Sequence, residues 1–545
     1  MTYKTFKSIF LAGAMALLFS ACGATALVST PIENIDNTPL KIAELSEAEK
    51  KSWMHADLRS DTIPGMSVDK AYKEIIGNKR GKTVIVAVMD TGIDLKHEDL
   101  DGVIWVNKGE RAGNGKDDDK NGYIDDIHGY NFLGEAYHEQ LEMTRIVKLK
   151  KGDASLQSKA KSKLDAERSQ TVQYKQQYEQ ILQAVKNADA AVKQHLKKNS
   201  YTKKDIIAIK TEDQALQQHI AILRHMFDIK DTIPEVIEEL NNGLKHFDEQ
   251  MKYHLNLDFD GRAVVGDNPY DIKDVSYGNG NPMNRSADES HGTHVAGIIA
   301  AERNNGRGMK GVANNVKIMS IRTVPNGDEY DKDIALGIRY AVDNGAKIIN
   351  ASFGKSFSPN ALWVYDALKY AAENDVLFIH GSGNDSENLD DPNNPGFPND
   401  HNNHLGAEIV NNVLEVGALE PKYGAQMVGS YSNYGHKNVD VFAPGSAIYS
   451  TLPGNKYDFQ DGTSMAAPAV AGVAALIRSH YPKLTAAQVK KIIMVSGQKT
   501  KATVILEGDT ENVRTFDKIS KSGKMVNAFN ALILAEKVSR GKINI

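Results

Sequence analysis

Three short stretches of the chain each place a residue capable of acid–base or nucleophilic chemistry at an expected strand end or helix start. They surround Asp90, His291 and Ser464, in that order along the sequence. A serine hydroxyl becomes a strong nucleophile when a histidine accepts its proton and a carboxylate orients that histidine. If the fold brings these three side chains together, they can perform acyl transfer.

The stretch around Ser464 reads Gly462-Thr-Ser-Met-Ala-Ala-Pro468 and continues almost without charge to Ile477. Because proline fits best in the first turn of a helix, Pro468 predicts that a helix begins at or just before Ser464. The free N–H groups and the positive dipole at that end favour negative charge on a reacting oxygen. The alternative is a turn that only caps a core helix, and this stretch alone does not exclude it.

Asp90 and the histidines lie at the ends of strongly predicted elements. Residues 82–90 form a β-branched run that is typical of a buried parallel strand. Asp90 is then at the carboxyl edge of the sheet, where open α/β sheets build their sites. The segment from His291 to His294 predicts the start of a helix, and either histidine taken alone is compatible with a purely structural role.

Strands and helices alternate along the rest of the chain. The expected elements are strands at 316–324, 346–353, 376–380 and 413–418, with helices such as 331–344 and 359–374 between them. This alternation predicts an α/β fold, a doubly wound parallel sheet with helices on both faces.

The composition narrows the class of protein. The chain has 545 residues, of which 41% are hydrophobic and 25% charged, and its formal net charge is −5. These values are typical of a soluble globular protein with two or more folding units. The weak net charge argues against a role in nucleic-acid binding.

The first residues resemble the secretory signal of bacterial lipoproteins. A basic start precedes an apolar run from Ile9 to Phe19, and Cys22 follows small residues. The resemblance implies that residues 1–21 are a signal peptide and that Cys22 carries a lipid. Residues 22–51 would tether the protein to the cell envelope, with the outer membrane as the expected location. The alternative is an ordinary signal peptide cleaved nearby. Because Cys22 is the only cysteine, no disulfide can form within one chain.

Three segments together resemble the motifs of the subtilisin-like serine proteases, in the order of that family. They are Met89-Asp-Thr-Gly92, His291-Gly-Thr-His-Val-Ala-Gly297 and Gly462-Thr-Ser-Met-Ala-Ala-Pro468. The resemblance covers roughly residues 67–132 and 264–535. It implies a serine endopeptidase that hydrolyses peptide bonds through an acyl-enzyme intermediate.

The resemblance also implies a role for each matching residue. Ser464 would be the nucleophile, His291 the general base, and Asp90 the carboxylate that orients the imidazole. Asn384 matches the side-chain donor to the oxyanion. The residues expected to contact the substrate are Ser352, Phe353, Gly354 and Gly383. The competing interpretation is a catalytically silent binding lipoprotein on the same fold. Such a protein would normally lack one of the catalytic residues, and all of them are present.

An acidic loop at residues 117–125 predicts a structural calcium site. Its D-x-D-x-N-G spacing directs several oxygens inward, and the glycine allows a sharp turn. The expected ligands are Asp117, Asp119, Asn121, Tyr123 and Asp125. The glutamate that closes an EF-hand loop is replaced by His128, and the alternative is a solvated acidic loop. No catalytic metal and no organic cofactor are expected.

A long helical insertion separates the first motif from the second. We expect a catalytic domain formed by residues 52–133 and 259–545, interrupted by the insertion at 134–258. Within the insertion, apolar residues follow a 4-3-4-3-4 spacing that predicts a coiled-coil seam. They are Tyr174, Tyr178, Ile181, Val185, Ala188 and Val192.

The two halves of the insertion carry opposite charge. Residues 145–204 contain 15 Lys/Arg and 5 Asp/Glu, a formal charge of +10, and residues 205–258 contain 5 and 11, a formal charge of −6. Opposite charges combined with apolar stripes predict an antiparallel helical hairpin folded on itself, in a chain expected to be monomeric.

The position of the insertion in the chain predicts its place in the fold. Because it leaves the sheet after Asp90 and returns before His291, its base must lie near the active-site edge. We therefore expect it to hinder access by folded proteins or to bind a protein partner, and the alternative is an ornament without function. The other expected partners are protein or peptide substrates and the membrane, and no nucleic acid.

Overall fold

The computed structural model describes residues 29–39, 41 and 43–545. The predicted signal peptide and Cys22 lie outside these residues. Within the described residues, a sheet of nine strands in the order β10-β13-β7-β6-β5-β4-β1-β3-β2 crosses the globular body. Its strands, in chain order, are β1 (Val84–Asp90), β2 (Gly129–Asn131), β3 (Val316–Arg322), β4 (Ile348–Ala351), β5 (Leu377–Gly381), β6 (Val413–Leu419), β7 (Val441–Pro444), β10 (Gln498–Lys499) and β13 (Lys524–Met525). Neighbouring strands pair in parallel except β10 with β13.

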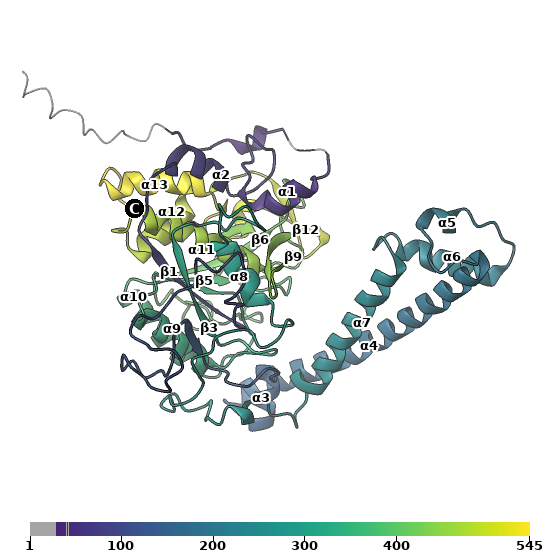
Figure 1. Cartoon of the computed structure of the whole chain (residues 1–545), viewed down its shortest axis with the longest axis horizontal. Helices are drawn as coiled ribbons and strands as arrows, with labels where there is room; N and C mark the ends of the chain where they lie inside the picture. Colours follow the sequence, from purple (N-terminus) through teal and green to yellow (C-terminus); the bar gives the residue numbers. More distant parts are fainter. Residues whose placement is uncertain (1–28, 40, 42) are drawn as a thin grey trace, which may run out of the picture.

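Helices cover both faces of this sheet (Figure 1). One face carries α8 (His291–Ala300), α11 (Thr463–His480), α12 (Ala486–Ser496) and α13 (Ala528–Ser539), and the other carries α9 (Asp331–Asp343) and α10 (Ala361–Glu373). Along β1, Val86 and Val88 join the first hydrophobic core, and Ala87 and Met89 join the second. Burial on both faces explains the continuous β-branched run, and the predicted doubly wound α/β sheet is confirmed.

The remaining elements of the body are short. They are the helices α1 (Glu47–Ser52) and α2 (Val68–Ala71) and two hairpins, β8 (Ile448–Leu452) with β9 (Lys456–Gln460) and β11 (Thr503–Leu506) with β12 (Asp509–Thr515). The β8 strand packs beside α8 and so supports the helix that begins with His291. In the described part of the chain, no helix combines the length and the apolar character that a membrane span requires.

The first described residues pack against the body, which differs from the polar tether expected for residues 22–51. Ile32 and Ile35 are 5% and 1% exposed. The Asn530 side chain accepts the N–H of Ile32 at 2.7 Å and donates to its carbonyl at 3.0 Å. The segment is held because its two isoleucines, three residues apart, bury their side chains in the core and its backbone is hydrogen-bonded to the body.

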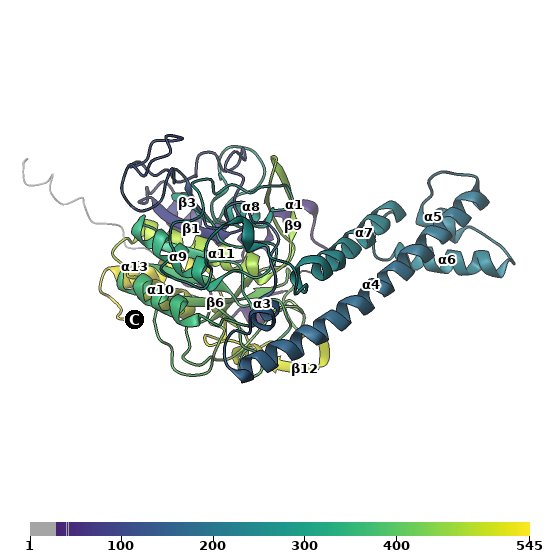
Figure 2. The same ribbon diagram turned by 90° about the horizontal axis from the view of Figure 1, so that it is seen from below.

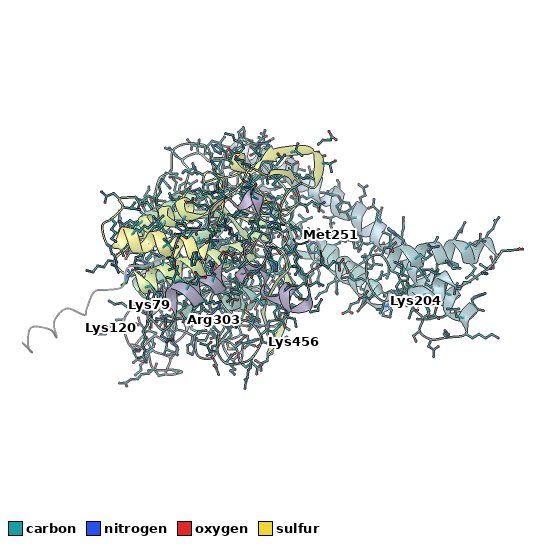
Figure 3. All side chains as sticks on the ribbon, turned by 90° about the horizontal axis from the view of Figure 1, so that it is seen from above. Lys79, Lys120, Lys204, Met251, Arg303 and Lys456 are labelled. Carbon is teal, nitrogen blue, oxygen red and sulfur yellow. The ribbon has the colours of Figure 1, made fainter. Side chains whose placement is uncertain are left out.

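The insertion projects from the body as a long arm (Figures 1 and 2). Its helices are α3 (Glu142–Leu149), α4 (Ala154–Leu196), α5 (Lys203–Ile207), α6 (Gln214–Met226) and α7 (Ile233–Glu249). α4 runs outward and α7 returns beside it, so the predicted antiparallel hairpin is confirmed. In Figure 3, Met251 lies where the arm joins the body, and Lys204 lies far out on the arm. The opposite charges meet directly, since Lys175 on α4 is 2.6 Å from Asp248.

The predicted apolar seam of α4 is only partly buried. Val185, Ala188 and Val192 are fully buried in the core of the outer arm. Tyr174 and Ile181, by contrast, are 43% and 41% exposed. The outer part of α4 packs against both α6 and α7, whereas the middle part contacts α7, so a fully buried stripe is needed only near the tip.

Candidate active site

Asp90 and His291 form a direct hydrogen-bonded pair at the carboxyl edge of the sheet. β1 ends at Asp90, which is 1% exposed, and α8 begins at His291. The imidazole Nδ1 lies 2.8 and 3.0 Å from the two carboxylate oxygens of Asp90. This contact makes Nδ1 the donor and leaves Nε2 free to accept a proton. The His291 side chain is 33% exposed, so the ring remains accessible to a substrate.

The Asp90 carboxylate also changes the basicity of His291. Burial opposes protonation of the ring, but the negative charge and the hydrogen bond of Asp90 outweigh burial and raise the pKa of His291 above its ordinary value. A histidine held in this way accepts a proton readily, because the imidazolium that forms is paired at once with a carboxylate.

The second histidine of the motif has a structural role. His294 is completely buried, and its Nε2 contacts the Asp458 carbonyl oxygen at 3.2 Å. Burial lowers the pKa of His294 to about 3, so this histidine stays neutral. Gly292 allows α8 to approach the turn after β1, because a Cβ at this position would lie 2.3 Å from the Gly92 carbonyl oxygen. This close approach places His291, and not His294, in contact with the Asp90 carboxylate.

The helix that carries Ser464 begins one residue earlier, at Thr463. Pro468 therefore lies in the second turn, which corrects the expectation that it belongs to the first. Proline lacks the N–H that would bond to the carbonyl of Ser464, four residues before it. The Ser352 hydroxyl takes that place and donates to this carbonyl at 2.8 Å. This hydrogen bond compensates for the missing N–H of the proline and connects the turn around Ser464 to the end of β4.

The Ser464 hydroxyl donates to the Ser352 carbonyl at 3.2 Å. Among the contacts of the described residues, none joins this hydroxyl to His291. α8 and α11 nevertheless pack together, and both begin at the same edge of the sheet. Hydrogen bonds between a nucleophile and its base often form only when substrate is bound, so the arrangement is compatible with proton transfer between them.

Asn384 is oriented by the start of α11. Its Oδ1 accepts the backbone N–H and the hydroxyl of Thr463, at 2.9 and 3.1 Å. Because Oδ1 is used in this way, both hydrogens of Nδ2 are left as donors. Gly462, with φ of 147°, adopts a conformation that favours glycine and turns the chain into the helix beside this amide.

A cavity of about 350 Å³ opens beside Ser464. Its lining includes the predicted substrate-contacting residues Phe353, Gly354 and Gly383, together with Asn384. Ser352 is the exception, because it is 4% exposed and its hydroxyl bonds to the backbone of Ser464 instead. Ends of two neighbouring strands, β4 and β5, therefore border one cavity next to the serine.

A buried histidine–glutamate pair behind this cavity was not identified from the sequence. His380, in β5, lies 2.8 Å from Glu415 in β6 through Nδ1, and its Nε2 contacts the Phe353 carbonyl. Burial opposes protonation, but Glu415 raises the pKa of His380 above its ordinary value. The contacts of the ring with Glu415 and with the Phe353 carbonyl connect three neighbouring segments of the cavity wall. The available signal was the occurrence of a histidine and a glutamate within two otherwise apolar strands.

Buried ions join the insertion to the loops that border the cavity. Arg145 on α3 is 1% exposed and donates to the carbonyls of Asp328 and Glu329 at 2.9 and 3.0 Å. Lys355, directly after the cavity-lining Gly354, lies 3.0 Å from Glu142 of α3. Because these buried cations are satisfied by partners on the other side of the junction, the base of the insertion is fixed to the active-site edge.

The structure places the five predicted calcium ligands in different surroundings. Asp117 accepts the backbone N–H of Asn121 at 3.1 Å, and Asp125 accepts the backbone N–H groups of Asn114 and Gly115, just before the loop. The Tyr123 ring packs against other aromatic rings of the second core. Of the five, only Asp119 joins a group of converging carboxylates.

That group consists of Glu110, Asp119 and Asp126, each with an oxygen within 4.8 Å of the others. Glu110 is 8% exposed, and its Oε2 has no hydrogen-bond partner among the described residues. Glu110 and Asp126 were not identified from the sequence, because they lie outside the D-x-D-x-N-G spacing. A buried, unpartnered carboxylate oxygen beside two further carboxylates fits a divalent cation.

Parts of this chain are similar to known proteins. Subtilisin DY of Bacillus licheniformis is 37% identical over 201 residues, which cover 37% of this chain and 67% of that protein. The thermophilic serine proteinase of Bacillus sp. (strain AK1) is 39% identical over 227 residues, which cover 42% of this chain. The match spans about half of the latter protein, 49% of its length. A solved protease structure from Pseudoalteromonas arctica PAMC 21717 is 31% identical, with a TM-score of 0.36, covering 45% of this chain and 70% of that one.

The profile of the subtilase family matches residues 81–508. This range runs from just before β1 to just after β11 and contains Asp90, His291, Asn384 and Ser464. The chain belongs to the subtilase family.

Proposed function

We propose that this protein is a serine endopeptidase that hydrolyses peptide bonds in protein substrates. The observation that carries the proposal is the contact of His291 with Asp90 at the sheet edge where α11 presents Ser464 to a cavity. Membership of the subtilase family supports it, as do the names of the relatives, which are proteases.

In the proposed reaction, the Ser464 hydroxyl oxygen attacks the carbonyl carbon of a substrate peptide bond. His291 Nε2 accepts the hydroxyl proton and later transfers it to the leaving amine, while Asp90 stays ionised and stabilises the imidazolium. The Nδ2 of Asn384 and the N–H of Ser464 stabilise the oxyanion. Water then hydrolyses the acyl ester on Ser464 by the same proton path, which releases the second product and regenerates the hydroxyl.

The test is hydrolysis of casein by the purified protein, combined with labelling by a fluorophosphonate. We expect hydrolysis, complete inhibition by the reagent, and a single labelled peptide that contains Ser464. Binding of casein without cleavage, and no label on Ser464, would instead support the alternative of a catalytically silent binding protein on this fold.

Replacing Asn384 with alanine is expected to lower kcat by about 10²–10³, the loss measured for the corresponding asparagine of subtilisin. KM should change little, because the amide stabilises charge that develops only in the transition state. Steady-state kinetics on one peptide substrate measure both constants. Asn411→Ala, at an exposed position, is the matched control. An increase in KM at unchanged kcat would contradict the assigned role.

We also propose that the protein binds structural calcium at Glu110, Asp119 and Asp126, a set that shares only Asp119 with the five ligands predicted from the loop. The support is the convergence of these carboxylates around the unpartnered Oε2 of Glu110. A calcium ion bound there would offset two of the three negative charges that lie close together in this partly buried site.

Removal of calcium by a chelator is expected to lower the melting temperature of the wild type. A ligand that binds only the folded state contributes about 2.7 kcal/mol when present at about 100 times its Kd. Scanning calorimetry with calcium and with chelator measures the difference. Glu110→Gln should abolish it, whereas Asp117→Asn should retain it, because Asp117 binds its own loop backbone. If only Asp117→Asn lost the difference in melting temperature between calcium and chelator, the result would support the ligands predicted from the loop.

The proposed location is the bacterial cell envelope, most simply the outer membrane, with a lipid on Cys22. The support is the sequence pattern around Cys22, which lies outside the described residues. Replacing Cys22 with serine should release the protein from the membrane fraction of the producing bacterium. Retention of the Cys22→Ser protein in that fraction would argue for another mode of attachment.

The outer part of the insertion is proposed to hinder access by folded proteins or to bind a protein partner. A structure-based truncation replaces residues 179–242 with a short Gly/Ser linker, since Tyr178 and Gly243 lie side by side. This change removes the tip and keeps the base that borders the cavity. If the truncated variant cleaves folded proteins faster than the wild type, the arm hinders their access to the cavity. If it cleaves them more slowly, the arm binds them as a partner site. Unchanged rates for both peptides and folded proteins would show that the outer arm has no role in cleavage.

A further inference from the structure

One wall of the cavity beside Ser464 is supplied by the insertion. Figure 2 shows α3 against the body at the base of the arm. The insertion residues that line the cavity are Leu141, Met143, Lys163 and Glu167. The chemistry of the pocket is therefore determined partly by α4, a helix outside the catalytic motifs.

Negative charge exceeds positive charge around this cavity. The lining contains the carboxylates of Glu167, Asp328, Asp385 and Glu387 and the basic groups of Lys163, Lys355 and His380. Lys355 is already balanced, because it lies 3.0 Å from Glu142 and 2.9 Å from Asp331, which are not part of the lining. Lys163 donates to the neutral Ser356 hydroxyl at 2.8 Å. His380 is paired with Glu415 at 2.8 Å, so Lys163 is the lining cation that has no carboxylate partner of its own among the described residues.

Glu167 is the carboxylate that the insertion adds. It is half-buried, and no described residue forms a hydrogen bond or ion pair with its side chain. Burial raises the pKa of Glu167, and the charges of Asp328 and Asp385 raise it further while Lys163 opposes them. Burial and Asp385 likewise raise the pKa of Glu387. Partly desolvated carboxylates that repel one another gain most from an incoming cation.

We propose that this pocket selects a lysine or arginine side chain next to the cleaved bond, and that Glu167 is a specificity-determining residue. The proposal rests on the peptidase activity proposed above and adds the substrate class. The aliphatic part of such a side chain would pack on the apolar lining, which includes Phe353, Met143 and Leu389. Its cation would then pair with Glu167 and the neighbouring carboxylates.

The experiment compares two fluorogenic peptides that differ only at the residue before the scissile bond, arginine in one and norleucine in the other. The ratio of their kcat/KM values is expected to exceed one in the wild type. Glu167→Gln should lower the ratio about tenfold, which corresponds to about 1.4 kcal/mol. Lys163→Gln should raise it, because the one opposing cation is removed.

Asp165→Asn is the matched control. It makes the same change of charge on the same helix, but Asp165 is exposed, pairs with Lys161 at 2.5 Å and does not line the cavity. The ratio should remain at the wild-type value in this variant. Melting temperatures of all variants verify that α4 remains folded.

Equal cleavage of both peptides by the wild type, or an unchanged ratio in Glu167→Gln, would overturn the selectivity and leave the peptidase assignment intact. A shift of the ratio in the same direction by Glu167→Gln and Lys163→Gln would indicate a disturbed helix and also overturn it. Failure to cleave any peptide, together with no fluorophosphonate label on Ser464, would overturn the proposed function itself.

Discussion

Ser464→Ala is expected to abolish peptide hydrolysis while leaving the fold unchanged. Removing the nucleophile of subtilisin lowers kcat by about 10⁶, and we expect a loss of the same order here. The Ser464 hydroxyl makes one long hydrogen bond, 3.2 Å to the Ser352 carbonyl, so its loss should cost at most about 1 kcal/mol of stability. Kinetics on a fluorogenic peptide and thermal unfolding measure the two effects.

Fluorophosphonate labelling is the control for this variant. The wild type should be labelled at Ser464 and the alanine variant not at all. Residual turnover above about a thousandth of the wild-type rate, insensitive to the reagent, would show that another residue is the nucleophile.

Asp90→Asn is expected to lower kcat by about 10⁴, the loss measured for this change in a serine protease of another fold. The asparagine amide can donate to Nδ1 of His291 and so stabilise the tautomer in which Nε2 carries the proton. That tautomer cannot accept the proton of Ser464. Kinetics on the same peptide measure the loss. Asp94→Asn is the matched control, since Asp94 lies in the same turn and accepts only backbone N–H groups.

The pH dependence of the two proteins should also differ. His291 must be neutral to act as a base, so the wild-type rate should fall as the pH drops through the raised pKa of His291. In Asp90→Asn the negative charge that raises this pKa is absent, and the acidic limb of the profile should move to lower pH. An acidic limb at the same pH in both proteins would mean that another group is titrating.

Much of the fold and of the candidate site was predictable from local sequence. The apolar run that ends at Asp90 is continuous because its strand is buried on both faces, and that pattern appears in the sequence itself. His291 and Ser464 follow turns and precede runs of small residues, so the helix starts could be located. The order of the three motifs then predicted the family.

The sequence was less informative where a residue depends on contacts from distant parts of the chain. Pro468 was expected in the first turn of its helix, because nothing local to it indicates that Ser352, 112 positions before Ser464, replaces the missing donor. The calcium pattern selected residues by spacing along the loop. The converging carboxylates include Glu110, which reaches the site from an earlier turn.

By itself, the sequence determined the α/β class of the protein, the identity of the three candidate catalytic side chains and the presence of a helical hairpin, because each depends on residue types and periodicity within one element. Only the tertiary structure decided which carboxylates converge, and that Glu167 of the insertion lines the cavity beside Ser464. These features depend on how separate elements pack, and packing is set by shape and burial across distances in sequence that no local pattern records.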